Sequence, residues 1–290
     1  MTNVTRSSRR ISPFRLSLLI VVAVGIVFAG YASVLTDFLW FDQLGFSSVL
    51  ITQVVAQAAM FLAGFIVLGG VTGLSFAIAY RSRPIYLKFP DQNDPFGVYR
   101  QLIEQLRKGV MIGLPILLGI FGGVASISKW DVVLAWFNRT YTGEVDPQFG
   151  LDISFYFFDL PFLTAITTYA SATVLIAGLL AAFVHTVFGG IRFNGRRSSI
   201  TKAARIQVSV MAALYLAIQG VSLWLDQYKT MTNSSGLYTG ATYADVNAVI
   251  PGFQILALIA AVVAVLFLVA AFIGQWRLPI MATGLMVVSS

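Results

Sequence analysis

The sequence predicts an all-α fold: a polytopic bundle of six complete transmembrane helices and a truncated seventh, with the N-terminus in the cytoplasm. Three observations lead to this prediction. Hydrophobic residues make up 58% of the chain and charged residues only 11%, whereas soluble domains carry about a quarter charged residues. Six long apolar runs contain no Asp, Glu, Lys or Arg. The charges between these runs alternate in sign from one connection to the next.

Each apolar run is long enough, or nearly so, to cross a bilayer as a helix, which takes about 20 residues. The runs cover residues 16–34, 49–80, 110–127, 162–188, 206–225 and 253–273. The second is the longest and should tilt or extend beyond the lipid. A further apolar run at 278–290 is too short to span, and we interpret it as the start of a seventh helix. The predicted organisation is therefore a basic N-terminal segment (1–15), a six-helix domain (16–277) and this last segment.

The first run has an alternative interpretation as a signal peptide, because arginines precede it at positions 6, 9, 10 and 15. The run is long for a signal sequence, and residues 35–40 (LTDFLW) do not form a small-residue cleavage site. We therefore favour an uncleaved helix.

The distribution of charge predicts the orientation. The N-terminal segment and every second connection hold most of the 19 basic residues, and the intervening connections hold most of the 12 acidic ones. Basic residues mark the cytoplasmic side of a plasma-membrane protein. The predicted partners are thus the lipid bilayer, with anionic lipid at the cytoplasmic face, and the net charge of +7 does not indicate nucleic acid. Envelope proteins or a second copy of the chain are further candidate partners.

One cytoplasmic connection predicts an amphipathic helix near residues 95–108. Asp94 is a good N-cap residue and Pro95 a good first helical residue. Apolar residues then recur at helical spacing opposite a charged face. We expect this helix to lie on the inner leaflet, with docking of a cytoplasmic partner as the alternative.

The outer connection after the third run contains a predicted short helix with Trp130, Val133, Leu134 and Phe137 on one face. It also holds Asp146 and Asp152, and their carboxylates suit a hard cation. Without the spacing of a calcium loop, we favour their capping of turns around Pro147 and Gly150. The chain has no cysteine and one histidine, so thiolate chemistry and multi-histidine metal sites are excluded, and we expect no cofactor.

Few polar residues lie within the apolar runs, where such groups often mark function. Gln53 and Gln57 share one face of the second run, and Gln219 lies in the fifth. They either line a polar path or, as we favour, bond neighbouring helices. His185, near the inner end of the fourth run, is either a proton-relay group or, as we favour, a packed or backbone-bonded residue.

Glycines and one proline indicate close helix contacts. Gly69 and Gly73, Gly109 and Gly113, and Gly119 and Gly123 have the spacing that lets helix backbones approach. Pro115 should kink the third run or free a carbonyl.

Four motifs along the chain are residues 37–46 (DFLWFDQLGF), 146–162 (DPQFGLDISFYFFDLPF), 185–192 (HTVFGGIR) and 240–251 (GATYADVNAVIP), the last of which contains the candidate functional residue Asp245. Through them the chain resembles the large actinobacterial and cyanobacterial membrane proteins of Uncharacterised Protein Family 0182. The resemblance implies a seven-helix N-terminal region followed by a large extracytoplasmic domain. It implies no catalytic or ligand-binding role for any residue.

Three functions are compatible with these observations. The first, which we favour, is a membrane anchor or assembly module for a large extracytoplasmic domain. The second is a transporter or lipid-handling channel, against which stands the lack of intramembrane carboxylates and bases. The third is a membrane-surface enzyme that uses outer-loop carboxylates such as Asp146 with Asp152.

Overall fold

The computed structural model describes residues 13–84, 107–194, 197–234 and 239–274, together with positions 281 and 284. The chain divides into two compact units, Met1–Ala56 and Gln57–Ser290. The predicted helix near 95–108 lies outside the described residues apart from its last two positions. The predicted seventh helix lies outside them except for positions 281 and 284.

The first unit contains α1 (Pro13–Gln43) and the beginning of α2 (Ser47–Arg81). The helix α1 runs well past the predicted end at residue 34 and includes Asp37 and Asp42, so the charge-free run underestimates its length. No Gly or Pro interrupts the sequence between residues 31 and 44, and α1 ends just before Gly45, which has a left-handed φ of 73°. Ser47 then donates a hydrogen bond to the Asp42 carboxylate (2.9 Å), which fixes the turn into α2.

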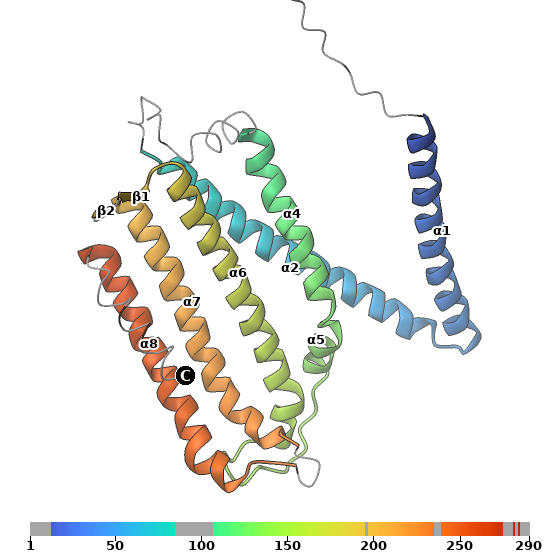
Figure 1. The fold of residues 1–290 in the computed structure, drawn as a ribbon. Coiled ribbons are helices and arrows are strands. Elements are labelled where there is room, and N and C mark those ends of the chain that lie inside the picture. The colour runs from blue at the N-terminus through green and yellow to red at the C-terminus, as the bar shows by residue number, and fades with distance from the viewer. Residues whose placement is uncertain are drawn as a thin grey trace, which may run out of the picture. The chain divides into compact units, whose positions relative to one another are not determined.

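The second unit is a bundle whose helices match the remaining predicted runs. They are α4 (Arg107–Ile127), α6 (Leu160–Val187), α7 (Lys202–Lys229) and α8 (Ile250–Ile273), packed with the part of α2 from Gln57 onward. The helices α6, α7 and α8 lie side by side in chain order (Figure 1). Across the described residues of both units, six helices are long and apolar enough to cross a membrane. The chain is therefore a membrane protein of mainly helical structure.

The connections between the long helices carry smaller elements. The helix α5 (Trp130–Phe137) forms where the sequence predicts it, but the side chain that anchors it is Trp136, which stacks on Phe162 at 4.1 Å between ring centroids. A hairpin of β1 (Ile191–Asn194) and β2 (Arg197–Ile200) joins α6 to α7 and is a departure from a purely helical fold. Asn194 pairs with Arg197, so two residues connect the strands, and the signal in the sequence is that the first of them is Gly195, since glycine at that position is typical of two-residue hairpin loops.

Two helices begin in the same unusual way. A π-helical turn, η1 (Phe155–Asp159) or η3 (Asp245–Val249), leads directly into α6 or α8, each of which has a proline in its first turn. The N–H groups of Leu160 and Ile250 donate five residues back, to Phe155 and Asp245. Proline has no N–H group to donate to a helix. Each of these prolines directly follows the residue whose N–H closes the π-helical turn. A short 3-10 turn, η2 (Thr230–Thr232), closes α7.

Glycine contacts join α2 to α4. A Cβ atom on Gly69 would lie 3.0 Å from the Pro115 carbonyl oxygen and 3.3 Å from the Cα of Gly119. One on Gly123 would lie 2.6 Å from the Phe61 ring. These positions confirm the close approach predicted for two glycine pairs. Among the described residues nothing lies within 4 Å of a Cβ added to Gly109 or Gly113, so for that pair the prediction was wrong. The helix α4 continues through Pro115.

Candidate functional site

A cavity of about 820 Å³ lies in the second unit, at the end that holds α5 and η2. Its walls come from α2, the end of α4, α5 and the first half of α6, and the end of α7 contributes to its rim. Most of the lining is apolar and includes Met60, Val67, Ala125, Val133, Phe162, Ile166 and Ala170. The volume lies within the range of about 300–1,000 Å³ that is typical of small-molecule sites.

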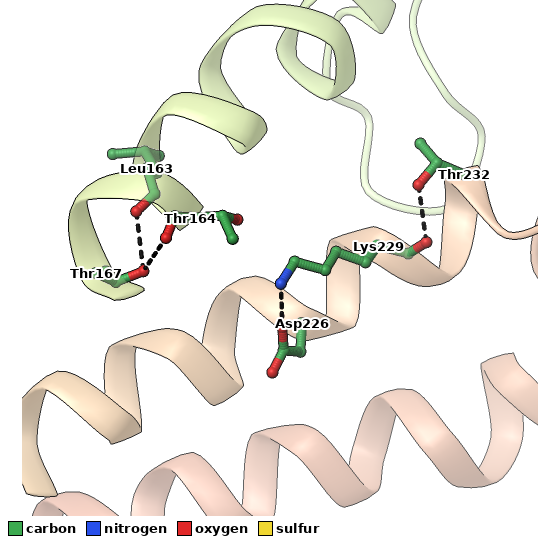
Figure 2. Close-up of polar contacts among 6 residues, drawn as sticks. All are labelled: Leu163, Thr164, Thr167, Asp226, Lys229 and Thr232. Atoms are coloured by element: carbon green, nitrogen blue, oxygen red, sulfur yellow. Dashed lines mark hydrogen bonds and ion pairs between the residues drawn. The ribbon is translucent and has the colours of Figure 1, made fainter. Parts of the chain in front are cut away.

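Two lysines add positive charge to this lining. Lys129 follows α4 and has an exposed side chain. Lys229 ends α7, and its ammonium group lies 2.6 Å from the Asp226 carboxylate one turn earlier (Figure 2). The Lys229 side chain is still 41% exposed, so this ion pair lies at the surface of the bundle.

Hydroxyl groups line the same end of the cavity. Thr232, which lines the cavity, donates to the Lys229 carbonyl oxygen (3.0 Å) (Figure 2). Thr167, which is not part of the lining, donates to the carbonyl oxygen of the lining residue Thr164 (3.1 Å). Threonine hydroxyls commonly bond their own helix in this way. The Thr164 hydroxyl itself is buried and has no hydrogen-bond partner in the described part of the chain.

The wall opposite α7 is held by a contact of three helices. Tyr169 on α6 donates from its hydroxyl to the Gly64 carbonyl oxygen of α2 (2.7 Å). Ser126 on α4 donates to the Gly122 carbonyl oxygen (2.8 Å), and its side chain lies against Gly64 of α2. Any side chain at Gly64 would collide with Ser126, so only glycine lets α2 and α4 approach here.

Asp146 organises the loop before α6. Its two carboxylate oxygens accept from the backbone N–H groups of Gln148 (2.8 Å), Phe149 (3.0 Å) and Leu151 (3.2 Å), and from the Tyr156 hydroxyl (2.8 Å). Burial alone would raise the pKa of Asp146, but hydrogen bonds, led by that of the Phe149 N–H, hold this pKa below its ordinary value. Since Tyr156 also lines the cavity, Asp146 fixes one of its walls.

Asp152 binds the same loop further along. It accepts from the Ser154 N–H (2.8 Å), the Thr142 hydroxyl (2.9 Å) and the Gly143 N–H (2.9 Å). Hydrogen bonds from Ser154 lower the pKa of the Asp152 carboxyl most, and those from Thr142 and Gly143 add to the effect. Both carboxylates are therefore occupied by contacts within the loop: Asp146 caps the turn around Pro147 and Gly150, whereas the partners of Asp152 are Thr142, Gly143 and Ser154. In the part of the chain that the structure describes, no group of three or more His, Asp or Glu side chains is arranged to hold a metal ion.

Asp245 caps the turn that begins α8. Its carboxylate accepts from the Thr242 N–H (2.8 Å) and hydroxyl (2.9 Å), and its own N–H donates to the Thr242 hydroxyl oxygen (3.1 Å). Such a reciprocal pair satisfies donors that a helix start leaves free.

His185 belongs to a buried network at the opposite end of the bundle. Gln207 of α7 donates from its amide nitrogen to the Ser75 carbonyl oxygen of α2 (2.8 Å), and Ser75 donates to the Ala177 carbonyl oxygen of α6 (2.9 Å). Because a carbonyl oxygen only accepts, the amide oxygen of Gln207 must face His185, 2.9 Å away. His185 therefore donates from Nε2, and the network joins three helices.

The remaining sequence candidates, Gln53 and Gln57, are half-buried on α2. The α2 wall of the cavity begins at Met60, and Gln57 is not part of it. Sequence reasoning did not single out Lys129, Lys229 or Gln207. Each of the two lysines comes shortly after an apolar run. This position could have indicated a cation at the edge of the membrane.

The helices are long and apolar enough to cross a membrane, and the bundle contains an apolar cavity with lysines at one end. These features define a membrane protein with a candidate site for a hydrophobic ligand. The model of the Uncharacterised protein family (UPF0182) matches residues 14–290, and the chain belongs to this family. It is 46% identical over 291 residues to a UPF0182 protein of Clavibacter michiganensis subsp. michiganensis, a match that covers 100% of this chain and 29% of that protein. A UPF0182 protein of Leifsonia xyli subsp. xyli is 45% identical over 93% of this chain and 27% of its own length. The chain thus spans less than a third of these curated relatives. No solved structure matches it.

Proposed function

We propose that this chain is the plasma-membrane domain that anchors and orients a large extracytoplasmic part of the longer proteins of its family. The observation that carries the proposal is that several buried polar side chains, among them Ser75, His185 and Gln207, join helices to one another. They bring together segments that are far apart in sequence, as a rigid anchor requires.

Four interhelical contacts support this role. The Gln207 network joins α2, α6 and α7, and Tyr169 joins α6 to α2. Gln254 of α8 donates to the Gln227 side chain of α7 (2.8 Å), and Arg205 of α7 donates to the Ala271 carbonyl oxygen of α8 (3.2 Å). Hydrogen bonds between helices in membranes contribute roughly 0.6–2 kcal/mol each.

The proposed orientation has the N-terminus in the cytoplasm. Basic Arg192, Lys202 and Arg205 lie near the end of the bundle where β1 and β2 connect α6 to α7. Acidic Asp146 and Asp245 precede α6 and α8 at the other end. The positive-inside rule then assigns the carboxylate end, with the cavity, to the outer side.

The absence of cysteine makes this orientation directly testable. Single cysteines in place of exposed Tyr141 and Tyr243 should react in intact cells with a membrane-impermeant maleimide. A cysteine in place of Ser199, which is exposed on β2, should react only after the membrane is opened. The reverse pattern would refute the orientation.

The anchoring role is tested in a full-length relative. In a strain that lacks the gene, the part beyond the matched segment, attached to an unrelated membrane anchor that leads to the same side, should restore the lost phenotype. The membrane domain alone should not. Full restoration by the membrane domain alone would refute anchoring as its role.

A lipid-handling function is the second candidate, and the apolar cavity is the observation that favours it. The membrane-surface enzyme is less well supported, because the hydrogen bonds at Asp146 and Asp152 give both carboxylates a role in the loop itself.

A further inference from the structure

The cavity has an apolar body and a basic end. Its body is formed by apolar side chains in the middle of long apolar helices, such as Val67 of α2 and Ala170 of α6. Its other end reaches Lys129, just beyond the end of α4, and Lys229, the last residue of α7. In a membrane, the first region lies at the depth of lipid chains and the second at the depth of headgroups.

The charges at this end favour an anion. Lys229 is paired with Asp226, whereas Lys129 is exposed and carries no ion pair within the described residues. Asp159, the acidic residue just before α6, accepts a hydrogen bond from the Trp136 indole N–H (2.9 Å) and forms an ion pair with Arg139 (3.8 Å). The lining therefore contributes two ammonium groups, of which Asp226 balances one.

We propose that the cavity binds one anionic phospholipid, with an acyl chain in the apolar body and the phosphate at Lys129 and Lys229. Apolar walls give ordered water few hydrogen-bond partners, and the surrounding bilayer supplies acyl chains at high concentration. Basic residues beside such a cavity select anionic headgroups. The inference concerns ligand binding and does not depend on the anchoring role.

The test compares lipids that differ only in their headgroup. The purified chain is equilibrated in detergent with phosphatidylglycerol or phosphatidylcholine of identical acyl chains, and retained lipid is counted by native mass spectrometry. We expect one retained phosphatidylglycerol and a weaker affinity for phosphatidylcholine, by about fivefold for each lysine that contacts the phosphate. Equal retention of both lipids would refute the assignment of the headgroup.

Two variants locate the site. The double variant Lys129→Gln, Lys229→Gln should lose the preference for phosphatidylglycerol. Lys202→Gln, an exposed lysine at the start of α7, should keep it. An unchanged preference in the double variant would overturn the proposal.

A third variant fills the apolar body. Ala165→Phe should reduce retention of both lipids, because Ala165 lines the cavity from α6. If this variant does not yield a monodisperse protein, Val133→Trp introduces bulk from α5, on another wall. Retention unaffected by a filled cavity would place the lipid elsewhere and overturn the proposal.

Discussion

Two polar regions of the second unit differ in how far apart in sequence their hydrogen-bonded residues lie. At one end, Gln207 bonds Ser75, 132 residues away in sequence, and His185, 22 residues away. At the other end, every hydrogen bond that the Asp146 carboxylate accepts comes from within ten residues. The first region determines which helices touch, and the second determines where a helix begins.

The difference has an energetic consequence. A bond between helices can break only if the bundle opens, because its partners lie on separate elements. A bond inside a loop can break while the bundle stays intact. Disrupting the interhelical contacts should therefore lower the stability of the whole second unit, whereas disrupting the loop contacts should act locally.

The largest effect is expected from Gly64→Ala. The new methyl group would collide with Ser126 and lie 2.6 Å from the Gly122 carbonyl oxygen, so α2 and α4 must separate. Forced overpacking costs typically about 1–3 kcal/mol. Thermal unfolding in detergent should show the loss. Gly70→Ala on the same helix, where the added atom meets nothing within 4 Å, is the control and should not lower the melting temperature, because alanine is the better helix former.

The next effect is expected from Gln207→Leu. It removes the partner of His185 and the bond to Ser75, and both groups lie in a buried site. We expect a loss of about 1–2 kcal/mol, measured by the same thermal unfolding. Gln219→Leu is the matched control, since Gln219 bonds only Tyr215 of its own helix (2.8 Å) among the described residues. Equal losses in the two variants would contradict the distinction between interhelical and local bonds.

The sequence predicted the local structure better than the long-range structure. Charge-free runs located the six long helices, and Asp146 was favoured as a turn cap because Pro147 and Gly150 follow it. The predicted end of α1 was wrong, because a charged residue does not end a helix. The signal that ends α1 is Gly45. The π-helical turns before α6 and α8 were not anticipated, although Pro161 and Pro251 each lie within one of the four motifs.

The contacts between helices had weaker signals. Glycine spacing identified Gly69, Gly73, Gly119 and Gly123, yet at Gly109 and Gly113 the same spacing carries no close contact among the described residues, because spacing does not indicate which face meets a neighbour. For His185 we favoured packing or a backbone bond; the side chain is buried, and its ring also pairs with the Gln207 side chain, which was not predicted. Nothing in one sequence indicates which helix faces that histidine, and the cavity likewise depends on which side chains meet.

A smaller, local effect is expected from Asp146→Asn. The neutral side chain keeps one acceptor oxygen but loses the charge that strengthens its hydrogen bonds, a local cost of about 1 kcal/mol. Hydrogen exchange of the Gln148 and Phe149 amides should accelerate, while the melting temperature of the bundle stays close to that of the unchanged chain. Glu144→Gln, an exposed residue of the same loop, is the control.

The same loop should respond to acid. The pKa values of Asp146 and Asp152 are lowered in the folded loop, so the unfolded loop binds protons more readily. Their stabilisation is complete above the ordinary aspartate pKa of about 3.9 and is lost as the pH falls toward the lowered values. The amide chemical shifts of Gln148 and Gly143 should therefore titrate with midpoints below about 3.9. A midpoint at or above that value would contradict the pairing.

The smallest effect is expected from Thr242→Val, which removes the hydroxyl that both donates to the Asp245 carboxylate and accepts from its N–H. Loss of a helix cap of this kind costs about 1 kcal/mol or less at an exposed helix start. Faster hydrogen exchange should be confined to the η3 turn and the first turn of α8, because α8 remains packed on α7 through Gly220 and Ala257. Tyr243→Ala, whose side chain is 85% exposed, should leave the same amides protected. Exchange that spread along α8 would mean that the cap supports the helix contact as well, and the separation of local from interhelical stability would fail at this end of the bundle.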